Sequence, residues 1–134
     1  MKDHNKKLAI GEELRRSDEA YQAAELLFKN GLIADAVSKL YYHLLYHTRA
    51  LLISKDLEPR SHEVVLRLFG LHFVKPGIFK PGSSHVLSKM MKFREEADYN
   101  PAYMFTEEDY KRFLGDVSGV VTDIRRYLSE SGMI

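Results

Sequence analysis

The chain contains no cysteine and no long apolar run, and these two absences narrow what it can be. Without cysteine there are no disulfides, no thiolate catalysis and no cysteine-ligated zinc site. No apolar run approaches the roughly 20 residues that a membrane span needs, and no apolar signal core follows the polar N-terminus. We therefore expect a soluble, cytoplasmic protein that does not enter a membrane.

Neither sign of charge dominates, because 20 Lys and Arg face 19 Asp and Glu. A net charge of +1 gives no overall attraction to nucleic acid, so any such binding must come from a local patch. The sequence also lacks a Gly-rich phosphate loop, a nucleophile elbow and a clearly spaced pair of carboxylates. These absences argue against the common nucleotide-hydrolysing and serine-hydrolase classes.

The length of 134 residues and the hydrophobic content of 45% suit one domain spanning residues 1–134. No segment alternates with a period of two, whereas apolar residues recur every three or four positions. The pattern predicts an all-α bundle of about five helices. The expected helices run over about 8–29, 33–55, from Ser61 to the Pro76-Gly77 break, from Ser83 or Ser84 to Tyr99, and from Thr106 to about 130.

Local signals set these boundaries. Gly31 suits the left-handed cap that ends the first helix. The second helix is the longest apolar one, so we place it at the centre of the bundle. Residues 76–83 are rich in turn formers and should be the most mobile loop. Thr106 and Asp109 resemble a capping box for the last helix. The predicted core stripe of the second helix is Ile33, Val37, Leu40, Leu44, Thr48 and Leu51, widened by Tyr41, Leu45 and Leu52.

The fourth helix ends its apolar stripe with charges. Leu87, Met90, Arg94 and Asp98 follow one another at spacings of three, four and four, so they share one face. Burying a charge is costly unless it is paired, and Arg94 and Asp98 can pair with each other. An Arg placed before its acid at this spacing is the poorer order for simple helix support. We therefore expect the pair to point inward or into a cleft, where it is either a structural ion pair or part of a functional site.

Histidines and tyrosines cluster on the second helix. His43 and His47 stand four residues apart, a spacing that can place two imidazoles on one metal ion. No acidic residue lies one turn away to complete the ligand set, so we expect no metal site and no cofactor. Packing or a partner surface explains the two histidines better. With Tyr42 and Tyr46 they predict an exposed aromatic and histidine face that serves as a dimer seam.

Two more histidines begin helices. His62 and His85 can organise a helix start, or act as a general base if the fold brings a substrate proton within reach. Basic residues around the third and fourth helices, with nearby phenylalanines, predict either a nucleic-acid patch or an ordinary solvated surface. These basic residues are Arg60, Arg67, Lys75, Lys80, Lys89, Lys92 and Arg94.

Several segments together resemble a HEPN domain over nearly the whole chain. The resemblance rests on the Gly31 turn, then on residues 35–43 (DAVSKLYYH), 50–55 (ALLISK), 58–62 (EPRSH), 68–69 (LF) and 94–99 (REEADY). They are most similar to the prokaryotic HEPN branch whose members pair with minimal nucleotidyltransferases. The resemblance implies a HEPN-like up-and-down bundle, a homodimer and a composite cleft across it.

The same resemblance bears on activity. HEPN proteins that cut RNA carry an Arg followed, four to six residues later, by a His. Arg94 matches the Arg, but Tyr99 stands where the His is expected. A tyrosine with a pKa near 10 is a poor proton shuttle at neutral pH. Related toxin–antitoxin proteins carry a tyrosine near this motif that the partner enzyme modifies, and the resemblance implies this role for Tyr99.

Two functions therefore stand side by side. The first is a binding and regulatory module, not itself an enzyme, that acts with a minimal nucleotidyltransferase in a toxin–antitoxin-like pair. In this case Arg94, Asp98, Tyr99 and His62 line a nucleotide or RNA cleft. The second is a metal-independent HEPN ribonuclease with a degenerate Arg-x4-6-His motif. The missing motif His favours the first.

Overall fold

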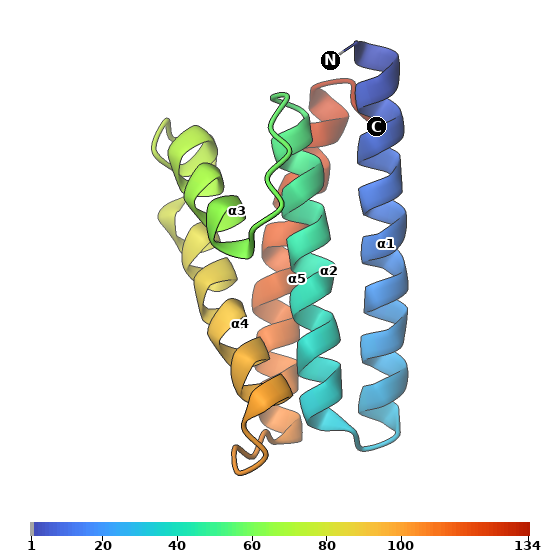
Figure 1. Cartoon of the computed structure of the whole chain (residues 1–134), viewed down its shortest axis with the longest axis vertical. Helices are drawn as coiled ribbons and strands as arrows, with labels where there is room; N and C mark the ends of the chain where they lie inside the picture. The colour runs from blue at the N-terminus through green and yellow to red at the C-terminus, as the bar shows by residue number, and fades with distance from the viewer. Residues whose placement is uncertain (1) are drawn as a thin grey trace.

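The computed structural model describes residues 2–134 and contains no strand among them. Figure 1 shows an all-α bundle in which the long helices run up and down. The elements are α1 (Asp3–Lys29), α2 (Ile33–Ile53), α3 (His62–Phe69), the π-helical turn η1 (Gly70–Val74), α4 (Pro81–Tyr99) and α5 (Glu107–Glu130).

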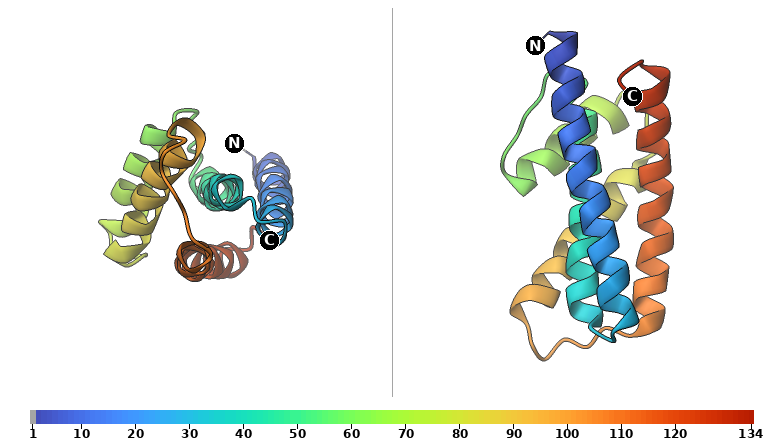
Figure 2. Two further views of the ribbon diagram at one scale, coloured as in Figure 1. Left: turned by 90° about the horizontal axis from the view of Figure 1, so that it is seen from below. Right: turned by 90° about the vertical axis from the view of Figure 1, so that its right-hand side faces the viewer.

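Helix α2 lies at the centre of this bundle. It contacts α1, α3, α4 and α5, and the end-on view of Figure 2 shows these helices arranged around it. Fourteen of its 21 residues are buried, among them Leu40, Leu44 and Leu51. Such a helix leaves little of its surface to water, which confirms its predicted central position. Only Ile33 of the predicted stripe is partly exposed.

Two predicted boundaries are confirmed by the backbone. Gly31 has a φ of +76°, the left-handed conformation that a glycine adopts without steric cost. Thr106 and Asp109 form the predicted capping box at the start of α5. The Asp109 N–H donates to Thr106 Oγ1 at 3.0 Å, and the Thr106 N–H donates to Asp109 Oδ2 at 2.9 Å.

The predicted start of the fourth helix is wrong. The helix begins at Pro81, because proline has the right φ for the first helical position and needs no hydrogen bond there. Ser83 is therefore inside α4 and buried, and it does not cap the helix. The loop before α4 is shorter than expected and is anchored by Phe79, whose ring packs on Phe69 and Phe73. The predicted third helix also divides, since η1 follows α3.

The expectation of one exposed histidine and tyrosine face on α2 is also wrong. His43 is 8% exposed and His47 is fully buried, and both contact Ser17 of α1. Tyr42 and Tyr46 stay at the surface, half-buried. The physical reason is that α1 packs along α2 and covers the two imidazoles. Of the predicted dimer seam, only the tyrosines remain open to a partner in this conformation.

The buried histidines form a closed hydrogen-bond network. Arg125 Nε of α5 donates to His47 Nε2 at 3.0 Å, so Nδ1 of His47 carries the proton and donates to Ser17 Oγ. Ser17 Oγ donates to the His43 carbonyl at 2.6 Å, and His43 Nδ1 donates to the Ser17 carbonyl at 3.0 Å. Both imidazoles are neutral in this arrangement, and α1, α2 and α5 are joined through them.

Acid should weaken this network. Burial, followed by the charges of His43 and Arg125, lowers the pKa of His47 to about 3, whereas an unfolded imidazole titrates near pH 6.5. The unfolded state therefore binds more protons between these two values. The contribution of His47 to the free energy of unfolding is full above about pH 6.5, and it falls by at most ~1.4 kcal/mol per unit as the pH drops below that value.

We therefore predict that His47→Gln, which keeps a donor and an acceptor, gives a shallower loss of stability than the parent between pH 6.5 and 4. Urea unfolding at several pH values measures this difference. His85→Gln, at an exposed position, is the control and should keep the parent profile. Identical slopes for the parent and His47→Gln would show that His47 does not resist protonation in the folded protein.

Candidate functional site

Arg94 lies on the face of α4 that packs against α2. Only 15% of its side chain is exposed. Its guanidinium carbon sits 5.5 Å from the centroid of the Tyr41 ring and 5.8 Å from that of Tyr42. A cation over aromatic faces is stabilised by the ring quadrupoles. The two tyrosines of α2 therefore hold the guanidinium in place.

The predicted pairing of Arg94 with Asp98 is confirmed, although the contact is loose. Arg94 Nη1 lies 3.6 Å from Asp98 Oδ2, and the Asp98 side chain is 29% exposed. A partly hydrated carboxylate at this distance neutralises the guanidinium only weakly. Because Asn100 and Pro101 end the helix just beyond the pair, water reaches it from that side.

His62, the first residue of α3, reaches the same guanidinium. Ser61 caps this helix by accepting from the Val64 N–H at 3.4 Å. The Nδ1 of His62 lies 3.2 Å from Arg94 Nη2 and 3.0 Å from the Tyr41 hydroxyl. A guanidinium only donates, so we assign Nδ1 as the acceptor and place the imidazole proton on Nε2. This Nε2–H has no hydrogen-bond partner in the described part of the chain.

Burial keeps the titratable side chains of His62, Tyr41 and Tyr42 uncharged at neutral pH. Burial, followed by the charge of Arg94, lowers the pKa of His62, so the imidazole stays uncharged at neutral pH. Burial likewise raises the pKa of both Tyr41 and Tyr42, so their hydroxyls stay protonated. Arg94 is thus the one cation among these four side chains; the other three are neutral, and Asp98 is the carboxylate that pairs with it.

Several donors of the site are unused. Arg94 Nε is buried and has no hydrogen-bond partner among residues 2–134. The Tyr42 hydroxyl and His62 Nε2–H also make no hydrogen bond within this range. A buried unpaired donor is costly, and a site with several of them favours a ligand that brings acceptors. A phosphate group has the charge and the oxygen atoms that such a site requires.

The structure brings three of the four predicted cleft residues together. Arg94 contacts both Asp98 and His62, whereas Tyr99 lies at the edge of the site: it is 75% exposed and makes no hydrogen bond in the described chain, but it is close enough to help raise the pKa of Arg94. Sequence reasoning assigned Tyr41 to the core and Tyr42 to a dimer seam, and it missed their contact with Arg94. Their position beside the core stripe of α2 was the one feature of the sequence that indicated this contact, because α4 was expected to pack on the central helix.

Other functional readings find less support in the geometry. No group of three or more His, Asp or Glu side chains lies close enough to hold a metal ion, as far as residues 2–134 are concerned. His85 is exposed and lies apart from Arg94, beside Leu66 and Arg67. No helix within residues 2–134 is both long enough and apolar enough to span a membrane.

Comparisons with known proteins place the chain in a family. A family model described as the HEPN domain matches residues 11–127. The "Putative toxin MJ0605" of Methanocaldococcus jannaschii is 33% identical over 114 residues, which cover 85% of this chain and 84% of that protein. A "UPF0332 protein" of Thermotoga maritima is 32% identical over 116 residues, covering 87% and 88%. The "Putative toxin MJ0142" of M. jannaschii is 23% identical over 121 residues, covering 90% and 82%. The chain belongs to the HEPN domain family.

Proposed function

We propose that this HEPN protein binds the phosphate of a nucleotide or an RNA at Arg94. In this proposal it is a binding and regulatory partner of a minimal nucleotidyltransferase in a toxin–antitoxin-like pair. The observation that carries the binding proposal is the Arg94 guanidinium itself. It is held over Tyr41 and Tyr42 while its Nε stays unpaired. The names of two relatives as toxins support the biological setting.

The chemistry of the site suits a phosphate better than a carboxylate-bearing protein segment. Arg94 supplies the charge, and the neutral His62 supplies a donor at Nε2 without adding a second desolvated cation. The Tyr42 hydroxyl adds a further donor, and its ring offers a face on which a base can stack. Asp98, weakly paired and partly hydrated, can turn away when a phosphate takes its place.

The proposal includes a homodimer and a partner enzyme. We expect Tyr42 and Tyr46, the open half of the predicted seam, to border the cleft between two copies of the chain. Tyr99 stands at the exposed end of α4 and is open to a modifying nucleotidyltransferase. Modification there would add a nucleotide close to Arg94 and change what the cleft can bind.

We predict that Arg94→Ala weakens binding of 5′-AMP or of a short RNA by roughly 10- to 100-fold, the worth of one or two charge-assisted hydrogen bonds. Isothermal titration or fluorescence anisotropy measures this loss. Arg94→Lys should recover only part of the affinity, because a lysine keeps the charge and loses the planar fork. The free energy of unfolding should change by less than about 1 kcal/mol, since Asp98 is partly hydrated.

Arg126→Ala is the matched control for that experiment. Arg126 is 60% exposed and pairs with Asp123 on its own helix, so it resembles Arg94 in charge and local pairing but lies outside the site. Equal affinities in Arg94→Ala and Arg126→Ala would refute binding at Arg94. A large loss of stability in Arg94→Ala without a loss of affinity would assign the arginine a purely structural role.

The second prediction of this proposal is a dimer. A chain of 15.5 kDa should sediment at twice that mass at micromolar concentration. The mass should not depend strongly on salt if apolar and aromatic contacts hold the copies together. Sedimentation equilibrium provides the measurement. A monomer at every concentration tested would remove the composite cleft, and Arg94 would then have to act within one copy.

The third prediction concerns Tyr99. Incubation with the partner nucleotidyltransferase and an α-phosphate-labelled nucleoside triphosphate should transfer the labelled nucleotidyl group to the Tyr99 hydroxyl with release of pyrophosphate, because this hydroxyl is open to solvent. Tyr99→Phe should abolish labelling, whereas Tyr103→Phe, a second exposed tyrosine close by in the chain, should not. Peptide mass spectrometry locates the label. Undiminished labelling of Tyr99→Phe would place the modification elsewhere.

The position of His62 favours a second candidate function, a HEPN ribonuclease. The sequence lacks the motif histidine after Arg94, yet the fold brings an imidazole to 3.2 Å from this guanidinium. Cleavage by 2′-hydroxyl attack needs both a base and an acid. His62 Nδ1 is occupied by Tyr41 and Arg94, and this leaves only the Nε2–H of a neutral imidazole, which donates a hydrogen bond but is a poor source of a proton. No free base of suitable pKa faces it in the described chain.

We accordingly predict that the purified protein binds RNA and cuts it weakly at most. Gel analysis of a labelled RNA over hours, with mass spectrometry of the ends, tests this expectation. Robust cleavage that disappears in both Arg94→Ala and His62→Ala would make the ribonuclease the correct function. Cleavage that persists in both variants would point to a contaminating nuclease, which the Arg126→Ala preparation controls.

A further inference from the structure

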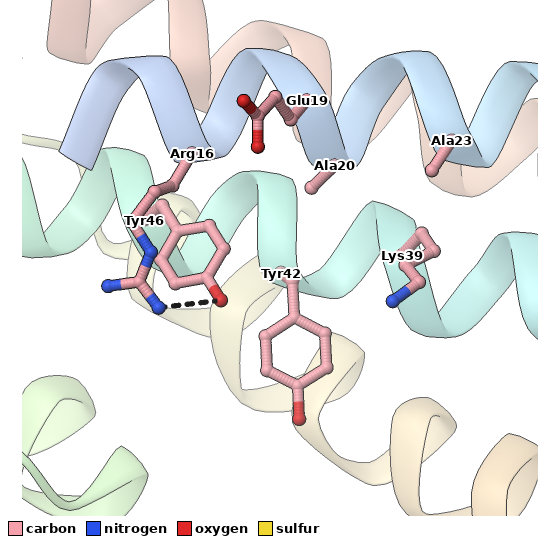
Figure 3. Close-up of a pocket in the computed structure, with 7 residues that line it drawn as sticks. All are labelled: Arg16, Glu19, Ala20, Ala23, Lys39, Tyr42 and Tyr46. Atoms are coloured by element: carbon pink, nitrogen blue, oxygen red, sulfur yellow. Dashed lines mark hydrogen bonds between the residues drawn. The ribbon is translucent and has the colours of Figure 1, made fainter. Parts of the chain in front are cut away.

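A second surface feature lies beside the Arg94 site, in the groove between α1 and α2. Figure 3 shows Arg16 reaching from α1 to Tyr46 on α2, with Tyr42 and Lys39 projecting from α2 further along. Ala20 and Ala23 form part of its wall, and their short side chains leave the groove open. Its volume of about 490 Å³ is within the range of ligand sites.

The groove carries an excess of positive charge. Arg16 is 44% exposed, and its nearest acid, Glu13, is 3.7 Å away and shared with Arg49 at 3.4 Å. Glu19 also lines the groove, but its carboxylate is bonded to Arg15. Lys39 is exposed and forms no ion pair within residues 2–134. Lys39 is therefore available to an anionic ligand, and Arg16, which donates to the Tyr46 hydroxyl at 3.3 Å, keeps further N–H groups for one.

Two aromatic rings lie between cationic side chains along α2. Lys39, Tyr42, Tyr46 and Arg49 follow at spacings of three, four and three, so they share one face of α2. The Tyr42 and Tyr46 rings are 5.9 Å apart, and the Arg16 guanidinium covers the Tyr46 ring at 4.5 Å. From Lys39 to Tyr46 the helix rises about 10.5 Å, roughly three stacked nucleotide steps.

Tyr42 joins this groove to the Arg94 site. Its ring lines the groove and also lies 5.8 Å from the Arg94 guanidinium. A ligand whose phosphate is held by Arg94 can therefore continue past Tyr42 into the groove. A mononucleotide is too short to contact both Arg94 and the far part of the groove. An acidic peptide would use the cations and leave the tyrosine faces without a partner, whereas a single strand of RNA uses both.

We infer that the α1–α2 groove is a track for single-stranded RNA that ends at Arg94, with Arg16 and Lys39 holding phosphates and Tyr42 and Tyr46 stacking bases. This inference rests on the proposed function, because it extends the ligand bound at Arg94. It makes the preferred ligand an oligonucleotide and not a free nucleotide. The cations of the track lie on two different helices, so the track depends on the packing of α1 against α2.

The test compares the affinities for a short and a long RNA oligomer. Both carry 2′-O-methyl groups, so they cannot be cut by 2′-hydroxyl attack. Fluorescein-labelled 2′-O-methyl adenylate oligomers of two and eight nucleotides are titrated with the full chain by fluorescence anisotropy. The eight-nucleotide oligomer should bind at least about tenfold more tightly than the dinucleotide at equal salt. Lys39→Ala and Arg16→Ala should each weaken octamer binding by roughly three- to tenfold and lower its salt dependence by about one phosphate contact. Neither variant should change the affinity for the dinucleotide.

Controls separate this inference from the function it extends. Lys111→Ala removes an exposed lysine of α5 and should leave both affinities unchanged. Tyr46→Leu should weaken the octamer, and Tyr46→Phe, which keeps the ring, should do so less. Arg16 pairs with Glu13, so Arg16→Ala also removes an ion pair. If that variant unfolds, Lys39→Ala decides the test, because Lys39 forms no ion pair in the described chain.

The outcomes that overturn the inference are distinct. Equal affinity for both lengths, with Arg94 still required, would leave the proposed function standing and remove the track. Loss of octamer binding in Lys39→Ala with no effect of Arg94→Ala would show that the groove binds RNA without Arg94. That result would overturn the proposed function and the end of the track at Arg94. Conversion of a dimer to a monomer by Arg16→Ala, with length-independent binding, would show that the groove is a contact between two protein chains.

Discussion

The burial of α2 is the constraint on which the rest of the structure depends. Four helices pack around it, so two thirds of its residues are buried and its open surface is confined to one strip that includes Lys39, Tyr42 and Tyr46. A helix in this position would ordinarily be apolar all round, yet α2 carries Tyr41, His43 and His47 among its buried residues. Buried polar groups must find partners within the protein or cost free energy. The partners come from α1 and α5 on one side, and from α3 and α4 on the other.

The two sides solve this problem differently. Toward α1 and α5, the network through Ser17 and Arg125 satisfies His47 completely and keeps both histidines neutral. Toward α3 and α4, the Tyr41 hydroxyl and Arg94 Nη2 both hydrogen-bond to His62 Nδ1. The Nε–H of Arg94 is buried and has no hydrogen-bond partner in the described chain. A closed network stabilises the bundle, whereas an open one with a cation keeps binding capacity for a ligand. The site thus lies at one of the places where polar groups around α2 remain incompletely paired; Glu13 Oε2 and Arg49 Nε, between α1 and α2, are buried and unpaired in the described chain as well.

Local patterns predicted the parts of this arrangement that depend on neighbouring residues. The α2 stripe, the Arg94–Asp98 pair and the Thr106–Asp109 capping box each involve spacings of three or four residues, which the sequence displays directly. The meeting of His62 with Arg94 joins residues 32 positions apart and depends on how α3 folds back onto α4. The burial of His43 and His47 was missed for a related reason. Periodicity says which residues share a face, but it does not say which neighbouring helix covers that face.

The central claim is that Arg94 fixes a neutral His62 so that its Nε2–H faces a bound phosphate. A long-range ¹H–¹⁵N correlation spectrum of the imidazoles at pH 7, with and without saturating 5′-AMP, tests it most directly. The account predicts a neutral His62 protonated at Nε2, whose Nε2 signal moves on adding the ligand while the signals of His47 stay in place. It also predicts that Arg94→Ala removes the response and weakens the tautomer preference, which then depends on the Tyr41 hydroxyl alone. A His62 protonated at Nδ1, or one that does not respond to a ligand bound by the protein, would contradict it.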